Sequence, residues 1–433
     1  THVLTKSGTQ QVPGSLFEFH RNAALDARNF FDRRTDSDPR RLPPFVRNEF
    51  GFTNGGPVVI PGIYNGSERT FYFGQYQGFR EVLGTTQVLA VPSLEERRGI
   101  NTTAFPGDTL YVPVSPSISP ILAAYPMPND PTGPFGSRTY AASSKVVTVT
   151  NQFSVRIDHK ISTKAQLFSR FSLNNVDGPL VNPNQTAIDP SFAVRFLDRQ
   201  RNFGLTYTRT FSPRLISETS LGFLRTTPLF PTVNRIQPSL VFADSLFEPF
   251  NRPGGQVSGT YGNVFQFRQS LAYVRRSHSL KFGFETRINR DSAVFAFYPN
   301  GQYTFGGGTA YSAVDIPSAS GLHNIRAGDA LPDSLSGFLT ATPFAFTSSA
   351  APAIFPQGDR IGLCTIRRES YNFYLQDSWR ISSSFSLSFG LRYEVNTRIH
   401  EANRLTSRLR LSGTFPFELN PQPAYVKDWI GFA

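Results

Sequence analysis

The sequence predicts an all-β fold, an antiparallel transmembrane β-barrel of which this chain supplies about eleven or twelve strands. Three observations carry the prediction. Apolar and polar residues alternate in segments close to the length that a tilted strand needs to cross a bilayer. The connections between these segments alternate between short turns and long loops. Aromatic residues make up 14% of the chain while mean hydropathy is only −0.25, as expected where apolar and aromatic residues occupy one face of each strand.

The strands follow one another as hairpins. Segment 153–159 carries Phe153 and Val155 on one face and Arg156 and Asp158 on the other, and the alternation resumes after a short connection at 161–164. The same unit recurs at 203–211 with 215–223, at 263–275 with 280–288, and at 371–379 with 385–395. Earlier strands are predicted at 14–20, 46–60 and 68–82.

The long connections fall on one side of the predicted barrel. They are about 22–45, 83–150, 175–199, 228–260 and 292–367, rich in Pro, Gly, Asn and Ser, and we expect no packed core within them. The extended stretch 294–305 is placed inside the last of these loops. Short turns on one side and long loops on the other are typical of outer-membrane barrels, with the turns in the periplasm and the loops outside the cell.

The two faces of the strands supply the candidate site residues. Candidate polar residues facing the barrel lumen are Arg156, Asp158, Arg170, Glu218, Glu285, Arg287, Arg392 and Glu394. Candidate lipid-facing or interfacial girdle residues are Phe153, Phe171, Tyr207, Phe223, Phe282, Phe284, Tyr371, Phe373, Trp379, Leu387, Phe389 and Tyr393. The lumen charges could guide a solute, but cross-strand pairing inside a wide barrel is the simpler interpretation.

Composition excludes several other classes. No apolar run is long enough for a transmembrane helix, and the single cysteine, Cys364, rules out an intrachain disulfide. The net charge of +12 does not indicate nucleic acid, because arginines are spread along the chain and the densest group, Arg33, Arg34, Arg40 and Arg41, is mixed with aspartates. The expected partners are outer-membrane lipid and lipopolysaccharide, because lumen or rim arginines of a barrel could attract anionic solutes or lipopolysaccharide phosphates. No signal peptide is visible.

No catalytic, cofactor or metal site is predicted. The six histidines are scattered without metal-binding spacing, and nucleophile-elbow and phosphate-loop motifs are absent. The run Gly306-Gly307-Gly308 lacks the Lys and the helix that phosphate binding needs. We therefore expect a protein that is not an enzyme.

Several motifs resemble a known family. They are "VLTKSGTQQVPGSLFEFHRN" (3–22), "LDARNFFD" (25–32), "RNEFGFTNGGPVVIPG" (47–62), "RTFYFGQYQGFRE" (69–81), "AVPSLEERRG" (90–99), "AAYPMPN" (123–129) and "YNFYLQDSWRISSSFSLSFGLRYE" (371–394). Their order and spacing resemble the TonB-dependent receptor superfamily, in particular large Oar-like members that carry a carboxypeptidase-regulatory-like domain. The middle of the chain, 175–367, matches in pattern more than in motif.

The resemblance implies an outer-membrane transporter of a Gram-negative bacterium. Its barrel would have about 22 strands around an amino-terminal plug, energised by the TonB complex, and would import a bulky nutrient such as an oligosaccharide, peptide or metal chelate. The resemblance implies that residues 1–13 are the end of the plug, that 14–400 are part of the barrel, and that 401–433 are an outer loop or a truncated end. The chain departs from the family in lacking a TonB box, nearly all of the plug and about half the strands, so we expect a fragment that does not transport unaided.

Two other functions remain open. One is an outer-membrane structural or adhesion barrel without active transport, which a complete gene lacking plug and TonB box would favour. The other is a soluble all-β binding protein, which would purify without detergent. The transported ligand, the oligomeric state and the role of the long loops are not readable from the residues.

Overall fold

The computed structural model describes residues 6–27, 44–179, 183–231, 238–251, 257–296, 298, 300–348, 363–403, 407–409 and 417–419. Most of the predicted loop 22–45, including the basic cluster at 33–41, and most of the terminal segment 401–433 lie outside these residues. Among the described residues no helix is long and apolar enough to cross a membrane.

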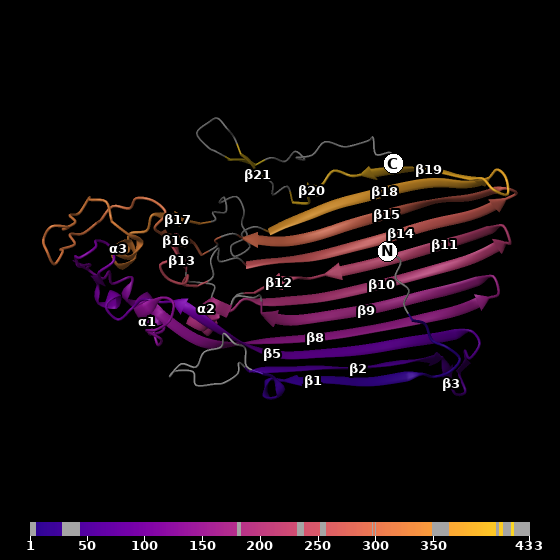
Figure 1. The fold of residues 1–433 in the computed structure, drawn as a ribbon. Coiled ribbons are helices and arrows are strands. Elements are labelled where there is room, and N and C mark those ends of the chain that lie inside the picture. Colours follow the sequence, from indigo (N-terminus) through magenta and orange to yellow (C-terminus); the bar gives the residue numbers. More distant parts are fainter. Residues whose placement is uncertain are drawn as a thin grey trace.

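One large antiparallel sheet dominates the molecule (Figure 1). Eleven of its strands follow the order β1-β2-β5-β8-β9-β10-β11-β14-β15-β18-β19, so each pairs with its neighbours in this order, which is also their order along the chain. Two short strands complete the sheet: β12 (Leu229–Phe230) pairs with β10 and β14, and β20 (His400–Glu401) pairs with β18. This up-and-down arrangement is the hairpin succession that the alternating segments predicted. In the described sheet β1 pairs only with β2 and β19 only with β18, so both outer strands are open edges.

The strands of this sheet are long. Their bounds are β1 Gly14–Asn22, β2 Phe45–Pro57, β5 Thr70–Ala90, β8 Thr139–Ser162, β9 Ala165–Pro179, β10 Arg195–Ser212, β11 Leu215–Thr226, β14 Val257–Arg275, β15 His278–Ala296, β18 Leu363–Arg380 and β19 Ser386–Asn396. Each predicted segment lies within or overlaps one of them. Several strands extend further than the alternation indicated: β5 and β8 pair as far as Ala90 with Thr139, well inside the predicted loop 83–150.

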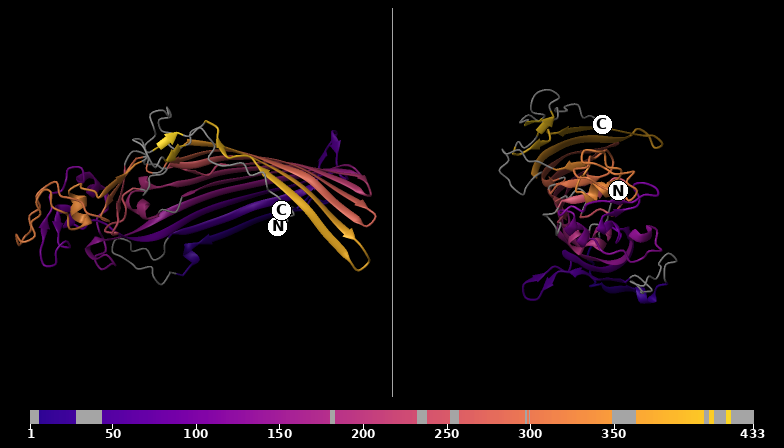
Figure 2. Two further views of the ribbon diagram at one scale, coloured as in Figure 1. Left: turned by 90° about the horizontal axis from the view of Figure 1, so that it is seen from above. Right: turned by 90° about the vertical axis from the view of Figure 1, so that its left-hand side faces the viewer.

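Short turns collect at one end of the sheet, which we call the turn end (Figure 1). Tight connections join β8 to β9, β10 to β11, β14 to β15 and β18 to β19. The connection between β2 and β5 carries a small hairpin of β3 (Val59–Ile60) and β4 (Tyr64–Asn65) at the same end. Figure 2 shows that the sheet is strongly twisted and curved.

The long connections fold together at the opposite end (Figures 1 and 2). Segments 91–138, 183–194, 238–251 and 300–348 form a compact body, which we call the loop cap. Its elements are η2 Glu96–Arg98, β6 Ile100–Asn101, β7 Leu110–Tyr111, α1 Ser119–Ala124, η3 Gly136–Arg138, α2 Pro183–Ile188, η4 Pro190–Phe192, β13 Ser239–Phe242, β16 Gln302–Phe305, α3 Ser334–Leu339 and β17 Ala345–Thr347. Strands β13, β16 and β17 make a small sheet of their own.

The expectation that the loops lack a packed core is wrong. The buried hydrophobic cluster of the described residues lies in the loop cap and draws on all four of its segments. Phe338 of α3 is fully buried against Phe242, Phe247 and Phe305, with ring centroids 5.3 to 6.0 Å apart. A fully buried side chain of this size contributes roughly 1.5–3 kcal/mol, so the cap has its own source of stability.

Stretch 294–305, predicted as extended within a loop, is divided between two sheets. Its first residues continue β15 to Ala296, and its last form β16, which pairs in parallel with β13 and antiparallel with β17. The parallel pair joins residues that are about sixty positions apart, which no local alternation could indicate.

Candidate functional site

The pairing register separates the predicted site residues into two sets. Directly opposed residues of an antiparallel pair point to the same face, as do residues two apart on one strand. A single row of partners runs Arg156, Arg170, Gly204, Gly222, Gln266, Arg287 and Ser370 from β8 to β18. All eight candidate lumen residues lie on the face of this row, which we call the polar face.

All twelve candidate lipid-facing residues lie on the other face, which we call the apolar face. A row of partners there runs Val155, Phe171, Phe203, Phe223 and Phe265, and Phe284, Phe373 and Tyr393 oppose one another further along. The division into faces follows from the register. Which face looks into a lumen and which to lipid stays a prediction.

Polar-face charges are paired with one another. Three ion pairs join residues two apart on one strand: Arg156 with Asp158 at 2.7 Å, Arg287 with Glu285 at 2.8 Å, and Arg392 with Glu394 at 3.5 Å. A fourth, Arg268 with Glu218, crosses between β14 and β11. Arg170 donates to Asn202 of β10 at 3.2 Å.

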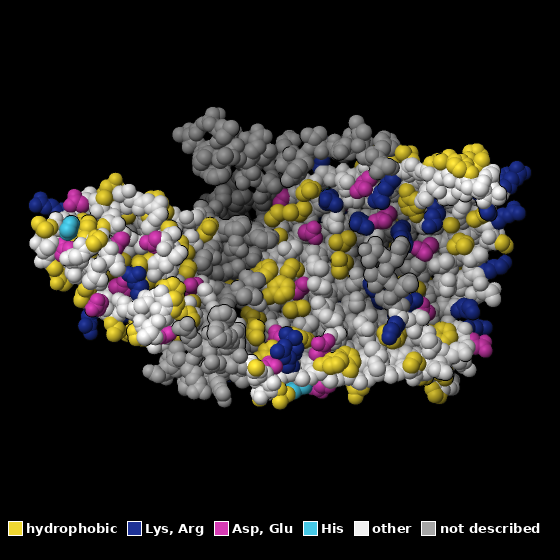
Figure 3. All heavy atoms as spheres, viewed as in Figure 1, with side chains coloured by type: hydrophobic (Ala, Val, Ile, Leu, Met, Phe, Trp, Pro, Cys, Tyr) yellow, Lys and Arg dark blue, Asp and Glu magenta, His cyan; other side chains and the backbone are white. Residues whose placement is uncertain are grey.

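The charges are paired, but only the pair of Arg268 with Glu218 is of the cross-strand kind that we expected, and the other three lie within single strands. Pairs this exposed contribute about 0–1 kcal/mol each. Figure 3 shows both signs of charge interspersed over the side of the molecule in view. The eight candidate residues of the polar face are four arginines and four acidic residues, so that face is mixed in charge and carries no single strong field.

Over the part of the chain that the structure describes, large side chains of the apolar face remain partly exposed. Phe282 is 38% exposed, Leu387 43% and Phe389 54%. Aromatic rings contact across neighbouring strands, with centroids 5.1 Å apart for Phe223 and Phe265 and 4.8 Å for Phe284 and Phe373. A soluble protein would bury such an apolar surface against a second layer of structure. An apolar surface that stays exposed indicates a contact with a membrane or with another protein.

Trp379 lies at the turn end of the apolar face. Its ring stacks on His278, with centroids 5.3 Å apart, and His278 is hydrogen-bonded to Asp377 at 2.6 Å. An amphipathic ring beside polar groups at the end of an apolar band has the character of an interfacial residue.

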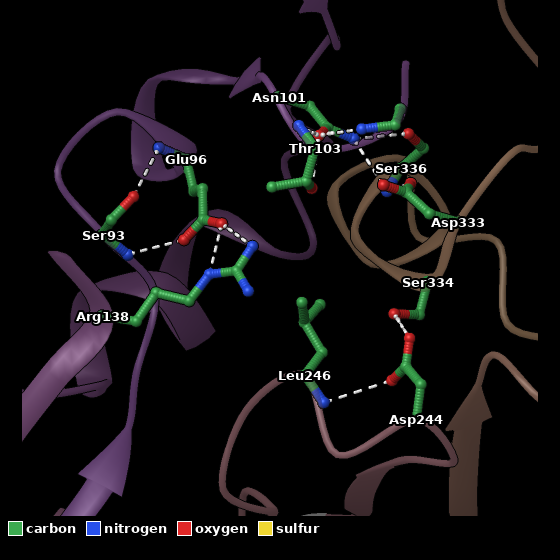
Figure 4. A network of polar contacts seen from close by, with 11 residues as sticks. Ser93, Glu96, Asn101, Thr103, Arg138, Asp244, Leu246, Asp333, Ser334 and Ser336 are labelled. Carbon is green, nitrogen blue, oxygen red and sulfur yellow. Dashed lines mark hydrogen bonds and ion pairs between the residues drawn. The ribbon is translucent and has the colours of Figure 1, made fainter. Parts of the chain in front are cut away.

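A polar network holds the loops of the cap together (Figure 4). Asn101 of β6 is fully buried, and its side-chain amide donates to Asp333 at 2.8 Å and to Ser336 at 3.1 Å in α3. Asp333 also caps α3 by accepting from the backbone N–H of Ser336 at 2.9 Å. Asn101 therefore joins two loops whose residues are 232 positions apart.

The motif "AVPSLEERRG" forms a tight corner of the cap. Ser93 and Glu96 exchange hydrogen bonds in the reciprocal pattern of a capping box, 2.8 Å from the Ser93 N–H to Glu96 and 3.3 Å from the Glu96 N–H to Ser93. Glu96 is only 6% exposed and is neutralised by Arg138, whose Nε donates to it at 2.7 Å. The chain leaves this corner through Gly99, which has φ +85°.

The neighbouring Arg97 binds the second motif, "AAYPMPN". Its guanidinium donates to the carbonyls of Leu122, Tyr125 and Pro126, the last at 2.7 Å, and its Nε donates to Pro92 at 3.0 Å. Burial lowers the pKa of Arg97. The two motifs of the first long loop are therefore parts of one folded unit.

A second cluster links the first and last loops. Asp108 accepts from Ser320 Oγ at 2.5 Å and from His323 Nδ1 at 2.8 Å, and His323 stacks on Phe105 with centroids 4.4 Å apart. The hydrogen bonds from Ser320 and His323 hold the pKa of Asp108 well below its usual range. Both other groups bond to the carboxylate, so the cluster has no free nucleophile and base arranged for catalysis.

Within the described residues no group of three or more His, Cys, Asp or Glu could hold a metal ion. Sequence reasoning missed the cap network, although the spacing of Ser93 and Glu96 was a readable capping signal. It also missed that the pairing register brings four arginines of the apolar face into one row, because alignment across strands cannot be read from one strand alone; they are Arg201, Arg225, Arg290 and Arg367.

A family model described as outer membrane beta barrel domain matches residues 4–428, nearly the whole chain. The chain belongs to this family. Membership confirms the predicted outer-membrane location and the barrel class of the sheet. A comparison with curated protein sequences found no match.

Several solved structures are similar. They include the outer membrane transporter YddB of Escherichia coli, at 9% identity with TM-score 0.44, covering 84% of this chain and 36% of that one. The ferric enterobactin receptor PfeA of Pseudomonas aeruginosa is 7% identical with TM-score 0.41, covering 92% and 41%. The siderophore receptor PirA of Acinetobacter baumannii is 11% identical with TM-score 0.42, covering 92% and 41%. The chain thus spans about two fifths or less of each structure's length.

Proposed function

We propose that this chain is part of a TonB-dependent receptor of the Oar-like type, which imports a bulky nutrient across the outer membrane. Membership of the outer-membrane barrel family supplies the location. The seven motifs between residues 3 and 394 supply the type. The loop end with its cap would face the cell exterior, the turn end the periplasm, and the polar face the lumen.

The loop cap is the observation that carries the proposal. Four separate connections converge on one hydrophobic core and are fastened by buried polar contacts such as those of Asn101. A barrel that only filled space in the membrane would have no need to order its outer loops. A rigid, assembled body at the mouth of a barrel is suited to selecting a ligand of large size, such as an oligosaccharide, a peptide or a metal chelate.

Uptake by the native bacterium tests the proposal. The full gene is deleted and restored, and accumulation of radiolabelled oligosaccharides, peptides and ferric chelates is measured with and without a protonophore. We expect one class to accumulate only in energised cells that carry the gene. Phe338→Ala, which removes about 3–5 kcal/mol from the cap core, should weaken that uptake while the barrel still assembles.

An adhesion or structural role is the second candidate, because a polar face of mutually paired charges does not by itself indicate a transport path. It predicts that gene deletion changes surface attachment or envelope integrity and leaves energised uptake of all three classes unchanged. That result would replace the transport proposal.

A further inference from the structure

Arginines gather in one row on the apolar face. The pairing register aligns Arg201 of β10 with Arg225 of β11, Arg225 with Asn263 of β14, Asn263 with Arg290 of β15, and Arg290 with Arg367 of β18. We call these five residues the arginine row. Four cations therefore lie in one row across five neighbouring strands, with Asn263 between Arg225 and Arg290, on the face that carries the aromatic residues.

The arginine row lies next to a row of phenylalanines of the apolar face, on the side toward the loop end of the sheet. One step toward the turn end, the register aligns Phe171, Phe203, Phe223 and Phe265. Leu280 is the first apolar residue of β15 after the turn. The stretch from Leu280 to Arg290 spans about 33 Å at ~3.3 Å per residue, which is about 25 Å along the membrane normal for a strand tilt of ~40°. That is the height of the apolar band of outer-membrane barrels, so the arginine row lies at the level of the outer head groups.

The arginine row is short of counter-charge. Arg290 pairs with Glu369 at 2.6 Å. Over the residues that the structure describes, Arg201, Arg225 and Arg367 make no ion pair. Arg201 bonds weakly to the carbonyl of Arg199, and Arg225 to Asn263, both at 3.4 Å. Like charges directly opposite one another destabilise a sheet, so Arg201 facing Arg225 indicates an anion supplied from outside the chain.

We infer that the arginine row binds the phosphates of lipopolysaccharide in the outer leaflet. Its guanidiniums can form bidentate hydrogen bonds to phosphate oxygens, and the phenylalanine row beneath them would contact the acyl chains of the same lipid. The inference rests on the outer-membrane location and on the orientation proposed above, with the apolar face in lipid and the loop end outside the cell, and it is independent of any transport function.

Binding of fluorescent bis-phosphorylated lipid A in mixed micelles tests the inference on the purified full-length protein. The test variant combines Arg201→Gln, Arg225→Gln and Arg367→Gln. The control variant combines Arg170→Gln, Arg287→Gln and Arg392→Gln, which removes the same charge from the polar face. We expect at least a tenfold loss of affinity in the test variant, a change within about twofold in the control, and weaker binding of dephosphorylated lipid A by the unmodified protein.

Two outcomes overturn the inference: equal affinity for phosphorylated and dephosphorylated lipid A, or equal losses in the two triple variants. Substitution of the same three arginines by lysine keeps the charge but loses the bidentate hydrogen bonds, so its affinity should fall between those of the unmodified protein and the test variant. If the test variant does not fold, displacement of lipid A from the unmodified protein tests the inference instead. Its lipid A should be displaced by inorganic pyrophosphate and by raised salt, and failure of both would contradict the proposal.

Discussion

Gly99 shows how a single residue shapes the cap. Its φ of +85° belongs to the left-handed region, and a Cβ there would lie 2.2 Å from the carbonyl oxygen of Val112. Gly107 has a similar φ of +81°, but a Cβ added to it would meet no atom within 4 Å. Gly99→Ala should therefore cost more than the roughly 1–2 kcal/mol of the backbone conformation alone, and Gly107→Ala about that amount. Cleavage of the cap by limited proteolysis, compared between the two variants, measures the difference.

Asp108 makes the cap sensitive to acid. Because its pKa is lowered in the folded protein by Ser320 and His323, its contribution to stability is complete above the unfolded pKa of about 4 and is lost as pH falls toward the folded value. Asp108→Asn should speed proteolysis of the cap at neutral pH, and this difference from the unmodified protein should shrink in strong acid. A difference that stayed constant below pH 4 would contradict the assignment.

The two faces of a strand should respond oppositely to the same substitution. Phe267 and Gln266 are neighbours on β14 but belong to different faces. With the apolar face toward lipid, as proposed, Phe267→Arg would place a charge in the hydrocarbon at a cost of about 2–4 kcal/mol. Gln266→Arg would lie beside Glu285, which already accepts a hydrogen bond from Gln266 at 3.1 Å. Folding yield of the full protein into lipid vesicles, followed by its shifted migration on unheated gels, should fall only for Phe267→Arg.

Strands and their faces were predictable because each depends on local alternation. Phe153, Arg156, Phe171 and Arg170 all lie on the faces that the period of two assigned. The loop ends of β5 and β8 were not predictable, because there the strands join the cap and Leu89 is buried in its hydrophobic cluster, a tertiary contact that local alternation does not indicate. The cap core escaped prediction for a different reason: its apolar residues are scattered over four segments with no period, and their meeting is a tertiary event.

The arrangement of the whole molecule predicts which residues are accessible on living cells. In a Cys364→Ser background, Leu322→Cys introduces a thiol in the cap at a position that is 83% exposed, and Ser383→Cys one at the β18–β19 turn. A membrane-impermeant maleimide should label position 322 on intact cells and position 383 only after the outer membrane is permeabilised. The reverse pattern would invert the orientation proposed above.

The two open edges of the large sheet, β1 and β19, also affect the molecule as a whole. In hydrocarbon an unpaired backbone group costs several kcal/mol, and within the described sheet β1 and β19 each have one strand partner. The membrane-spanning form of the protein therefore needs further strand pairing along both edges, as in a closed barrel.

The long-range contacts of the cap constrain how the protein is made. Asn101 and Asp333 are separated by 232 positions in the chain, so their hydrogen bond closes a very long loop. Contacts at such separation form late. While the chain is in transit through the periplasm, Phe242, Phe247 and Phe338 would be exposed to water and prone to aggregation. Chaperones that shield apolar segments during export should therefore govern the yield of this protein more than the stability of its finished fold.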